Sequence, residues 1–523
     1  MPTPHDGSAN VLLRQVSRAM FWNAAMLPVI AAVNLAAAVM IRRGFGLESG
    51  VYDVALGVVN TLLAHSALGV STTIVQFVPA LDRTGGRTAV RAFVTRVATL
   101  RLGLLLAVLV ALGLFADQAA ALLGLGASGG WIIRLVSVLV LLRAIADLSI
   151  KSLQALLAHF RANVVQLAQA VALAAAVAFT MTSGGSMTVL FAGLTALSVI
   201  VAGLSVWMAS STIGGTTETA GAGAGISLPS WSKVWTFALF MYMFEASNYF
   251  ATPAFASVAL AAAGGTQGTI AVFNVAFQFP LMIVTILLAG FQGLYRPLFA
   301  SLMAEGVKER LHTTFSEISK VQTLLLVPAG IGLALLLPDY ISLLFGDQFA
   351  AAAPLARALC LLLFGEALLN LGSIMLSVDR RYALTTMTQA LRIAAAPAFV
   401  WLAVRGNLLA AATVFGAGRV LASAVGFSIA RRLYGVRYPW AFSARVLLAA
   451  LPMALLVMAA RLFLPHGWAA TAALTTAGAL LTLVSARVLR VLGPREAGLL
   501  TRAEIPGGAV VARWLVPRME EGE

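Results

Sequence analysis

Three carboxylates within long apolar runs are the residues of this sequence with the clearest chemical potential: Glu245, Glu366 and Asp53. If those runs cross a membrane, as their composition indicates below, each charge costs about 2.5–3.5 kcal/mol on insertion scales and should face a cavity or a partner. A carboxylate in such a place can bind and release a proton or another cation. We therefore predict these three residues as candidate sites for a coupling ion.

Two arginines also lie within apolar runs. Arg419 has no acidic residue nearby in the sequence, so it needs a carboxylate on another helix, a substrate anion or water; Glu245 and Glu366 are the candidate partners. Arg143 and Asp147 are four residues apart, a spacing that allows an ion pair along one helix. We predict that this second pair is structural.

Uncharged polar residues follow one face of several apolar runs. Residues spaced by three, four and seven positions share a helix face, and this spacing groups Glu245, Asn248, Tyr249 and Thr252. The same geometry groups Asn274 with Gln278, Asn23 with Asn34, Asp53 with Asn60, and Glu366 with Asn370. Such stripes either line a hydrated cavity or fasten helices together through hydrogen bonds. The length of the stripes favours the cavity, and both interpretations stay open.

Membrane-spanning helices are the elements that must position these residues. Of 523 residues, 60% are hydrophobic and 11% are charged, which excludes an ordinary soluble protein. A helical crossing takes about 20 apolar residues. We predict fourteen spans, at 20–41, 54–78, 97–116, 131–150, 163–182, 187–208, 234–257, 269–294, 321–338, 355–377, 383–404, 408–430, 443–464 and 468–488. The predicted fold class is an all-α polytopic membrane protein, and Cys360, the only cysteine, excludes a disulfide framework.

The net charge of +15 indicates membrane orientation rather than a nucleic-acid partner. A nucleic-acid binder gathers its basic residues on a soluble face, whereas here they lie between apolar runs. Most of the 35 Lys and Arg residues fall on one side of the membrane if both termini are cytoplasmic, as the positive-inside rule requires. Arg42 and Arg43, at the outer end of the first span, depart from that rule.

The spans are predicted to form two lobes of six helices, residues 1–208 and 234–430. Residues 209–233, rich in Gly and Thr, are a flexible cytoplasmic linker. Residues 431–490 hold two additional spans, and 491–523 form a cytoplasmic tail. Because six is even, both lobes start from the same side, as parallel repeats do.

An internal repeat is favoured by matches at an offset of 220 residues. That offset aligns Arg161 with Arg381, Gln169 with Gln389, and Phe179 with Phe399. We therefore expect the two lobes to be pseudo-symmetric.

Several short motifs then resemble one family. The stretches FGLESGVY at 45–52, LGVS at 68–71 and QFVPALDR at 76–83 resemble the opening of bacterial polysaccharide flippases in the multidrug, oligosaccharidyl-lipid and polysaccharide exporter superfamily. The second half adds YRP at 295–297, EGVKER at 305–310, Pro328, and LFGDQF at 344–349. These motifs cover most of the chain in the order expected for that family.

The resemblance implies a two-lobed bundle in the bacterial inner membrane. It would move a lipid-linked oligosaccharide of the polyprenyl diphosphate type from the cytoplasmic to the periplasmic leaflet by alternating access. The last two spans would be peripheral to a twelve-helix core. The implied partners are the bilayer, the lipid-linked substrate and a polysaccharide polymerase or assembly protein that would act after transport. We expect no cofactor and no metal.

A diphosphate crossing a membrane needs cationic groups or oriented donors, and arginine binds phosphate oxygens bidentately. The predicted substrate-binding residues are the arginines Arg42, Arg43, Arg296 and Arg419, together with Asn23, Asn34, Asn60, Asn248, Tyr249, Asn274 and Gln278.

Two alternatives belong to other classes. A multidrug or cation antiporter of the same superfamily needs an acidic cavity without unpaired arginines. An integral-membrane polysaccharide polymerase or ligase needs a sizeable outside loop, whereas the longest outside connections, about 117–130 and 339–354, are short. The sequence also holds no P-loop and no nucleophile motif, so we expect a protein that is not an enzyme.

Overall fold

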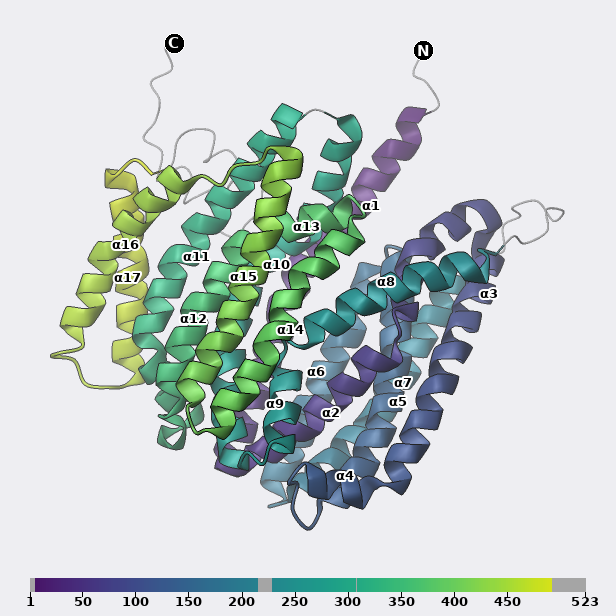
Figure 1. Cartoon of the computed structure of the whole chain (residues 1–523), viewed down its shortest axis with the longest axis horizontal. Helices are drawn as coiled ribbons and strands as arrows, with labels where there is room; N and C mark the ends of the chain where they lie inside the picture. Colours follow the sequence, from purple (N-terminus) through teal and green to yellow (C-terminus); the bar gives the residue numbers. More distant parts are fainter. Residues whose placement is uncertain (1–4, 215–227, 307, 492–523) are drawn as a thin grey trace. The chain divides into compact units, whose positions relative to one another are not determined.

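The computed structural model of the chain describes residues 5–214, 228–306 and 308–491. Within those ranges the backbone is almost entirely helical and has no strand (Figure 1). The chain forms two compact units, Met1–Ala271 and Val272–Glu523, which are called the first and the second unit below. The protein is an all-α polytopic membrane protein, as its composition predicts.

The first unit contains the two longest helices that the structure describes, of 41 and 45 residues. Its helices are α1 (His5–Phe45), α2 (Gly50–Ser66), α3 (Val70–Leu114), α4 (Ala116–Leu122), α5 (Gly129–Ala155), α6 (His159–Thr182), α7 (Met187–Gly214), α8 (Trp231–Tyr249) and α9 (Pro253–Ala262), with a 3₁₀ turn η1 (Gly46–Ser49). Within this unit α8 packs against α2 and α3, and α9 packs against α2. The assignment of residues 1–208 and 234–430 to two lobes stays a prediction.

The second unit contains most of α10 (Gln267–Glu305) and the remaining helices. These are α11 (Lys308–Phe345), α12 (Ala352–Leu369), α13 (Leu371–Val378), α14 (Tyr382–Val404), α15 (Leu408–Tyr434), α16 (Trp440–Ala460) and α17 (Trp468–Val488), with a 3₁₀ turn η2 (Asp347–Phe349). The predicted linker and tail lie mostly outside the described residues: α7 ends at Gly214, and the described chain ends at residue 491.

Eleven segments of the described chain are long and apolar enough to cross a membrane, against fourteen predicted spans. One span fewer results because the first predicted span and the start of the second belong to a single 42-residue segment, Ala25–Ser66. Two spans fewer result because α5 and α8 are not among the eleven segments. Helix α5 carries Arg134, Arg143, Asp147 and Lys151, and this charge lowers its apolar character.

Three of the predicted spans are interrupted helices. The span predicted at 54–78 breaks between α2 and α3, where Leu68 and Gly69 have positive φ. The span at 234–257 breaks between α8 and α9, and Thr252 caps the N-terminus of α9. The span at 355–377 breaks at Asn370, between α12 and α13. Hydropathy does not reveal such breaks, because the average over a window of about 20 residues stays high across each of them.

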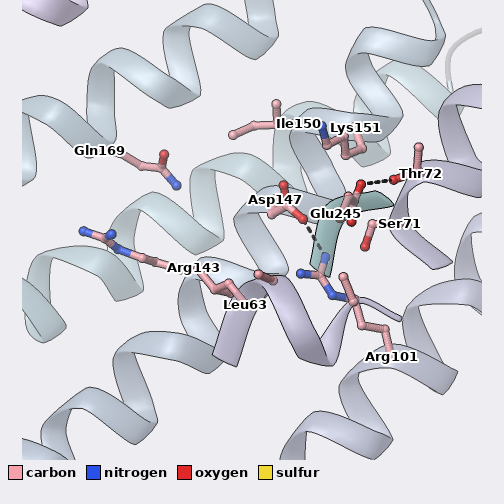
Figure 2. Close-up of a pocket in the computed structure, with 12 residues that line it drawn as sticks. Leu63, Ser71, Thr72, Arg101, Arg143, Asp147, Ile150, Lys151, Gln169 and Glu245 are labelled. Atoms are coloured by element: carbon pink, nitrogen blue, oxygen red, sulfur yellow. Dashed lines mark hydrogen bonds and ion pairs between the residues drawn. The ribbon is translucent and has the colours of Figure 1, made fainter. Parts of the chain in front are cut away.

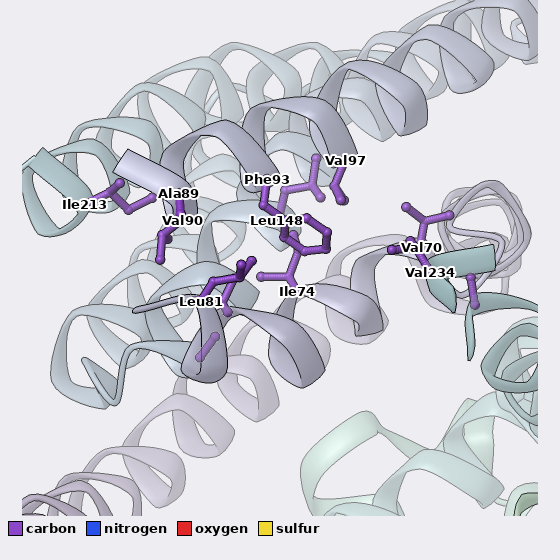
Figure 3. Packing of buried hydrophobic residues seen from close by; sticks show 13 residues of the cluster. Val70, Ile74, Leu81, Ala89, Val90, Phe93, Val97, Leu148, Ile213 and Val234 are labelled. Carbon is purple, nitrogen blue, oxygen red and sulfur yellow. The ribbon is translucent and has the colours of Figure 1, made fainter. Parts of the chain in front are cut away.

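Helix α3 contains a sharp turn at Gly86, where φ is 63° and ψ is −168°. Few residues other than glycine adopt this conformation. Buried residues on both sides of the turn pack into one cluster, including Ile74, Val78, Val90 and Phe93 (Figure 3). The two arms of α3 therefore form a hairpin, which the sequence alone predicted as the end of one span and the start of another.

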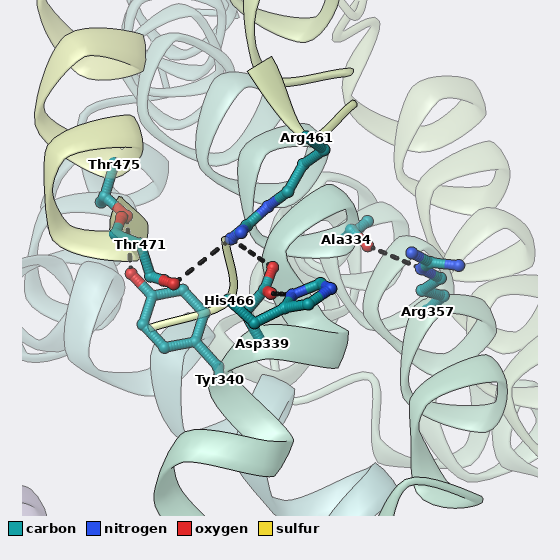
Figure 4. Close-up of polar contacts among 8 residues, drawn as sticks. All are labelled: Ala334, Asp339, Tyr340, Arg357, Arg461, His466, Thr471 and Thr475. Atoms are coloured by element: carbon teal, nitrogen blue, oxygen red, sulfur yellow. Dashed lines mark hydrogen bonds and ion pairs between the residues drawn. The ribbon is translucent and has the colours of Figure 1, made fainter. Parts of the chain in front are cut away.

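The two C-terminal helices, α16 and α17, pack against α11 in the second unit. The buried residues of this contact are Leu336, Ala450, Met453, Val457 and Leu474. A polar cluster lies beside them (Figure 4). The buried Asp339 of α11 forms an ion pair with Arg461, and its Oδ1 lies 2.6 Å from Nδ1 of His466. The hydroxyl groups of Tyr340 and Thr475 share a hydrogen bond of 2.7 Å. Apolar packing and one buried carboxylate thus hold both helices on α11.

A buried thiol lies in the packing between α12 and α11 of the second unit. Helices in lipid associate through close packing and hydrogen bonds, since lipid tails are as apolar as the side chains. Cys360 of α12 is fully buried, and its Sγ lies 3.6 Å from the carbonyl oxygen of Gly330 on α11. The only thiol of the sequence is therefore enclosed between two helices.

Candidate functional site

A cavity of about 370 Å³ lies within the first unit, lined by α2, α3, α5, α6 and α8 (Figure 2). Its volume is near the lower end of the range typical of small-molecule sites, roughly 300–1,000 Å³. Helix α5 contributes Arg143, Asp147 and Lys151, which are spaced by four residues and so share a face. Helix α3 contributes Thr72 and Arg101 from its two arms. The turn at Gly86 brings these two residues, which are far apart in sequence, to one cavity.

The carboxylates of the cavity each have a close donor. Arg101 Nη1 donates to Asp147 Oδ2 at 2.6 Å, and the Arg101 side chain is only 1% exposed. The Thr72 hydroxyl donates to Glu245 Oε1 at 2.7 Å. Lys151 interacts electrostatically with Glu245. The acidic groups of the cavity are thus compensated by residues that approach from α3 and from α5.

The predicted ion pair between Arg143 and Asp147 is wrong. Asp147 pairs with Arg101 instead, and Figure 2 shows the Arg143 side chain directed away from Asp147. The spacing permitted a pair along α5, but the α3 hairpin supplies a competing guanidinium from a neighbouring helix. Sequence reasoning missed Arg101, which lies near the start of the third predicted span, 97–116. We interpreted it as one of the cytoplasmic charges that set the membrane orientation.

The first predicted substrate arginine is occupied by a carboxylate. Arg42 Nη2 lies 2.6 Å from Asp53 Oδ1, and Arg42 Nη1 donates to the Ser49 hydroxyl at 2.7 Å. Both charged residues are almost fully buried. Arg43, the next residue, is exposed at the end of α1. Neither Arg42, Arg43 nor Asp53 lines the 370 Å³ cavity.

The predicted polar residues of the first unit divide between helix contacts and exposed positions. Asn23 accepts a hydrogen bond of 2.8 Å from Asn163, and the Tyr249 hydroxyl lies 2.5 Å from that of Thr61. Exposed positions are occupied by Asn34, Asn60 and Asn248. Of the predicted site residues in this unit, only Glu245 lines the cavity. The stripe from Glu245 to Thr252 is also interrupted, because α8 ends at Tyr249.

In the second unit, Glu366 holds two arginines. Glu366 Oε1 lies 2.7 Å from Arg392 Nη2, and Oε2 lies 2.6 Å from Arg419 Nε. Arg419 also lies over the ring of Phe277, 5.4 Å from its centroid. The prediction that a carboxylate on another helix, with Glu366 as a candidate, pairs with Arg419 is confirmed. That Arg392 joins the same carboxylate was not predicted, because Arg392 was counted among the charges that set orientation.

Two further predicted residues of this unit contact each other: Gln278 donates to Asn274 at 3.0 Å along α10. The side chain of Arg296 lies outside the described residues. None of these predicted roles in substrate binding is tested by the contacts alone.

Comparison with known proteins gives a fold. No protein-family model matches the sequence, and no curated protein sequence matches it. Among solved structures, the lipid II flippase MurJ in an inward closed conformation has a TM-score of 0.68 at 13% identity, over 90% of this chain and 98% of that chain. The chain has the fold of MOP superfamily transporters.

Two other solved structures have this fold. An inward-facing multidrug resistance transporter of the MATE family has a TM-score of 0.59 at 17% identity, covering 80% of this chain and 98% of its own. A MOP superfamily transporter from Pyrococcus furiosus has a TM-score of 0.55 at 17% identity, and the match covers 80% of this chain and 95% of that chain. The resemblance stated from the sequence motifs is confirmed for the superfamily fold, and the narrower assignment to polysaccharide flippases stays a prediction.

Proposed function

We propose that the protein is a flippase of the bacterial inner membrane that moves a lipid-linked oligosaccharide from the cytoplasmic to the periplasmic leaflet. The observation that carries the proposal is the charge of the 370 Å³ cavity, where Arg101, Arg143 and Lys151 face only two carboxylates, Asp147 and Glu245. An excess of cationic groups suits an anionic substrate such as a polyprenyl diphosphate. The similarity to a lipid II flippase over nearly all of that protein supports the same class of transport.

A multidrug or cation antiporter is the second candidate, because one of the similar structures is a multidrug resistance transporter of the MATE family. Such a protein needs a cavity in which acidic groups exceed basic ones, since its substrates are amphiphilic cations. The balance in the described cavity is the opposite. That the protein transports its substrate and does not convert it chemically is part of the proposal, and the similarity to a flippase and to transporters supports it.

Transport is expected to proceed by alternating access, with Glu245 as the coupling-ion candidate that the geometry favours. Glu245 lies in the cavity and accepts a hydrogen bond from Thr72. Glu366 and Asp53 are each paired with buried arginines, which supports a structural role for both. Both termini are proposed to be cytoplasmic, with a polysaccharide polymerase or assembly protein acting on the product.

The test is to delete the gene and measure lipid-linked oligosaccharide on the cytoplasmic face, with the wild-type gene restored as a control. Accumulation that the restored gene removes supports the flippase. No accumulation, in a strain without a second flippase, contradicts it. Resistance to lipophilic cations on overexpression, without any accumulation, would favour the antiporter.

A further inference from the structure

Arg143 differs from the other arginines that lie deep in the two units. The structure gives a carboxylate to Arg42, Arg101, Arg392 and Arg419. Within the described ranges it records no ion pair and no hydrogen bond for Arg143. The ionisable neighbour with which Arg143 interacts is the phenol of Tyr52, which is neutral at ordinary pH and supplies no compensating charge.

The formal charges of the described lining residues sum to +1, and those of Arg101, Lys151, Asp147 and Glu245 cancel without Arg143. Arg101 compensates Asp147, and Lys151 interacts with Glu245. Figure 2 shows these four groups together on one side of the cavity, with the guanidinium of Arg143 on the other. The net charge of +1 is therefore located at one end of the cavity.

Gln169 of α6 accompanies Arg143 at that end. Both residues line the 370 Å³ cavity, and both also line a second, smaller cavity among α5, α6 and α7. Among the residues that the structure describes, no hydrogen bond is recorded for the amide of Gln169. A guanidinium and a carboxamide with free N–H groups together form an acceptor-binding pair.

The chemistry of this pair selects an anion with several oxygens. An uncompensated cation in a span costs about 2.5–3.5 kcal/mol on insertion scales, so an anionic ligand gains by neutralising it. The guanidinium fork matches the oxygens of a phosphoryl group, with which it forms two parallel hydrogen bonds, and an amide N–H can donate to a third oxygen.

We propose that Arg143 and Gln169 bind a phosphoryl group of the transported molecule. The proposal rests on the proposed function and adds the substrate contact: the phosphate of the lipid carrier is held at the α5–α6 end of the cavity. Arg101, Asp147, Lys151 and Glu245, whose formal charges sum to zero, line the opposite side of the cavity. Sugar residues beyond the phosphate contribute less to recognition, because the formal charges on the opposite side cancel and the net charge of the described lining residues lies at this end.

The experiment measures binding to the purified full-length protein in detergent. The probes are farnesyl diphosphate, inorganic diphosphate, and farnesol as a neutral lipid. Arg143→Gln should weaken binding of farnesyl diphosphate at least tenfold. The matched control is Arg134→Gln, the same substitution on the same helix, where Arg134 pairs with the exposed Asp117; it should bind as the wild type does.

A second variant separates loss of binding from loss of folding. Gln169→Glu places a carboxylate beside Arg143, so it should weaken diphosphate binding while leaving the melting temperature equal to or above that of the wild type. Equal weakening for both diphosphate probes would support a site that takes any phosphoryl anion. Weakening confined to farnesyl diphosphate would support a lipid phosphate.

Wild-type affinity in both Arg143→Gln and Gln169→Glu would overturn the proposal, as would tighter binding of farnesol than of either diphosphate. This result is distinct from failure of the proposed function. Loss of diphosphate binding in Arg143→Gln, with no accumulation of lipid-linked oligosaccharide in the deletion strain, would keep the site and reject the flippase. Accumulation in the deletion strain, with normal binding and transport by Arg143→Gln, would do the reverse.

Discussion

Replacing Glu366 with Gln should destabilise the second unit more than any exposed ion pair could. One carboxylate holds Arg392 at 2.7 Å and Arg419 at 2.6 Å, and the three side chains are 8–14% exposed. Removing one partner of a buried ion pair typically costs about 3–5 kcal/mol, because the remaining charge is left uncompensated. Here two guanidinium groups lose their charge partner. We therefore expect a loss at the upper part of that range.

The assay is unfolding in mixed detergent micelles, followed by tryptophan fluorescence. The control is Asp117→Asn, which breaks the exposed pair with Arg134 and should cost at most about 1 kcal/mol. Adding Arg419→Gln to Glu366→Gln should recover roughly 1–3 kcal/mol, since one uncompensated charge is removed from a coupled pair.

The size of the effect decides between charge pairing and plain hydrogen bonding. Interhelical hydrogen bonds measured in a membrane protein average about 0.6 kcal/mol and reach about 1.7 kcal/mol. A loss within that lower range for Glu366→Gln, with no recovery in the double variant, would refute the reasoning. It would also return Glu366 to the set of candidate coupling residues.

Three other substitutions test separate features. The flipping rate of the wild type in proteoliposomes should depend on pH, and Glu245→Gln should remove that dependence; a variant with the pH profile of the wild type would exclude Glu245 as the coupling group. Asp339→Asn leaves the buried Arg461 without its carboxylate, so it should loosen α16 and α17 by on the order of 3 kcal/mol, measured as faster proteolysis at residues 461–467; unchanged cleavage would contradict this. Gly86→Ala should lower the free energy of unfolding by about 1–3 kcal/mol, because the backbone conformation of Gly86 is unfavourable for alanine. The control Gly113→Ala lies on the same helix with open space around it and should unfold as the wild type does.

The fold class could be predicted from composition, and the positions of most helices from hydropathy. The breaks after α2 and α8 were not predicted, because hydropathy averaged over a whole span stays high across both, although Pro253 at the first position of α9 is a local signal for a helix start. Window averages register the loss of apolar character and not a change of backbone direction. The turn at Gly86 falls in the predicted connection between the second and third spans, but hydropathy did not show that helical arms continue on both sides of it and pack together.

The candidate site was predicted only in part. Glu245 was identified from its charge within an apolar run, and Glu366 was named as a partner of Arg419 because a buried cation needs an anion. Arg101 was missed, because a charge near the end of a span satisfies either topology or a cavity and the sequence does not distinguish them. Arg143 was assigned a carboxylate that pairs with Arg101 instead, since helical spacing shows which residues can meet and not which neighbouring helix competes.

The burial of Cys360 has a practical consequence. Its thiol is enclosed between α12 and α11, and no other cysteine exists in the sequence. A membrane-impermeant maleimide added to intact cells would therefore report almost solely on cysteines introduced by design. Single cysteine replacements of exposed residues such as Arg405 and Arg381, which lie on opposite predicted sides of the membrane, would show on which side each connection lies. No native thiol would have to be removed first.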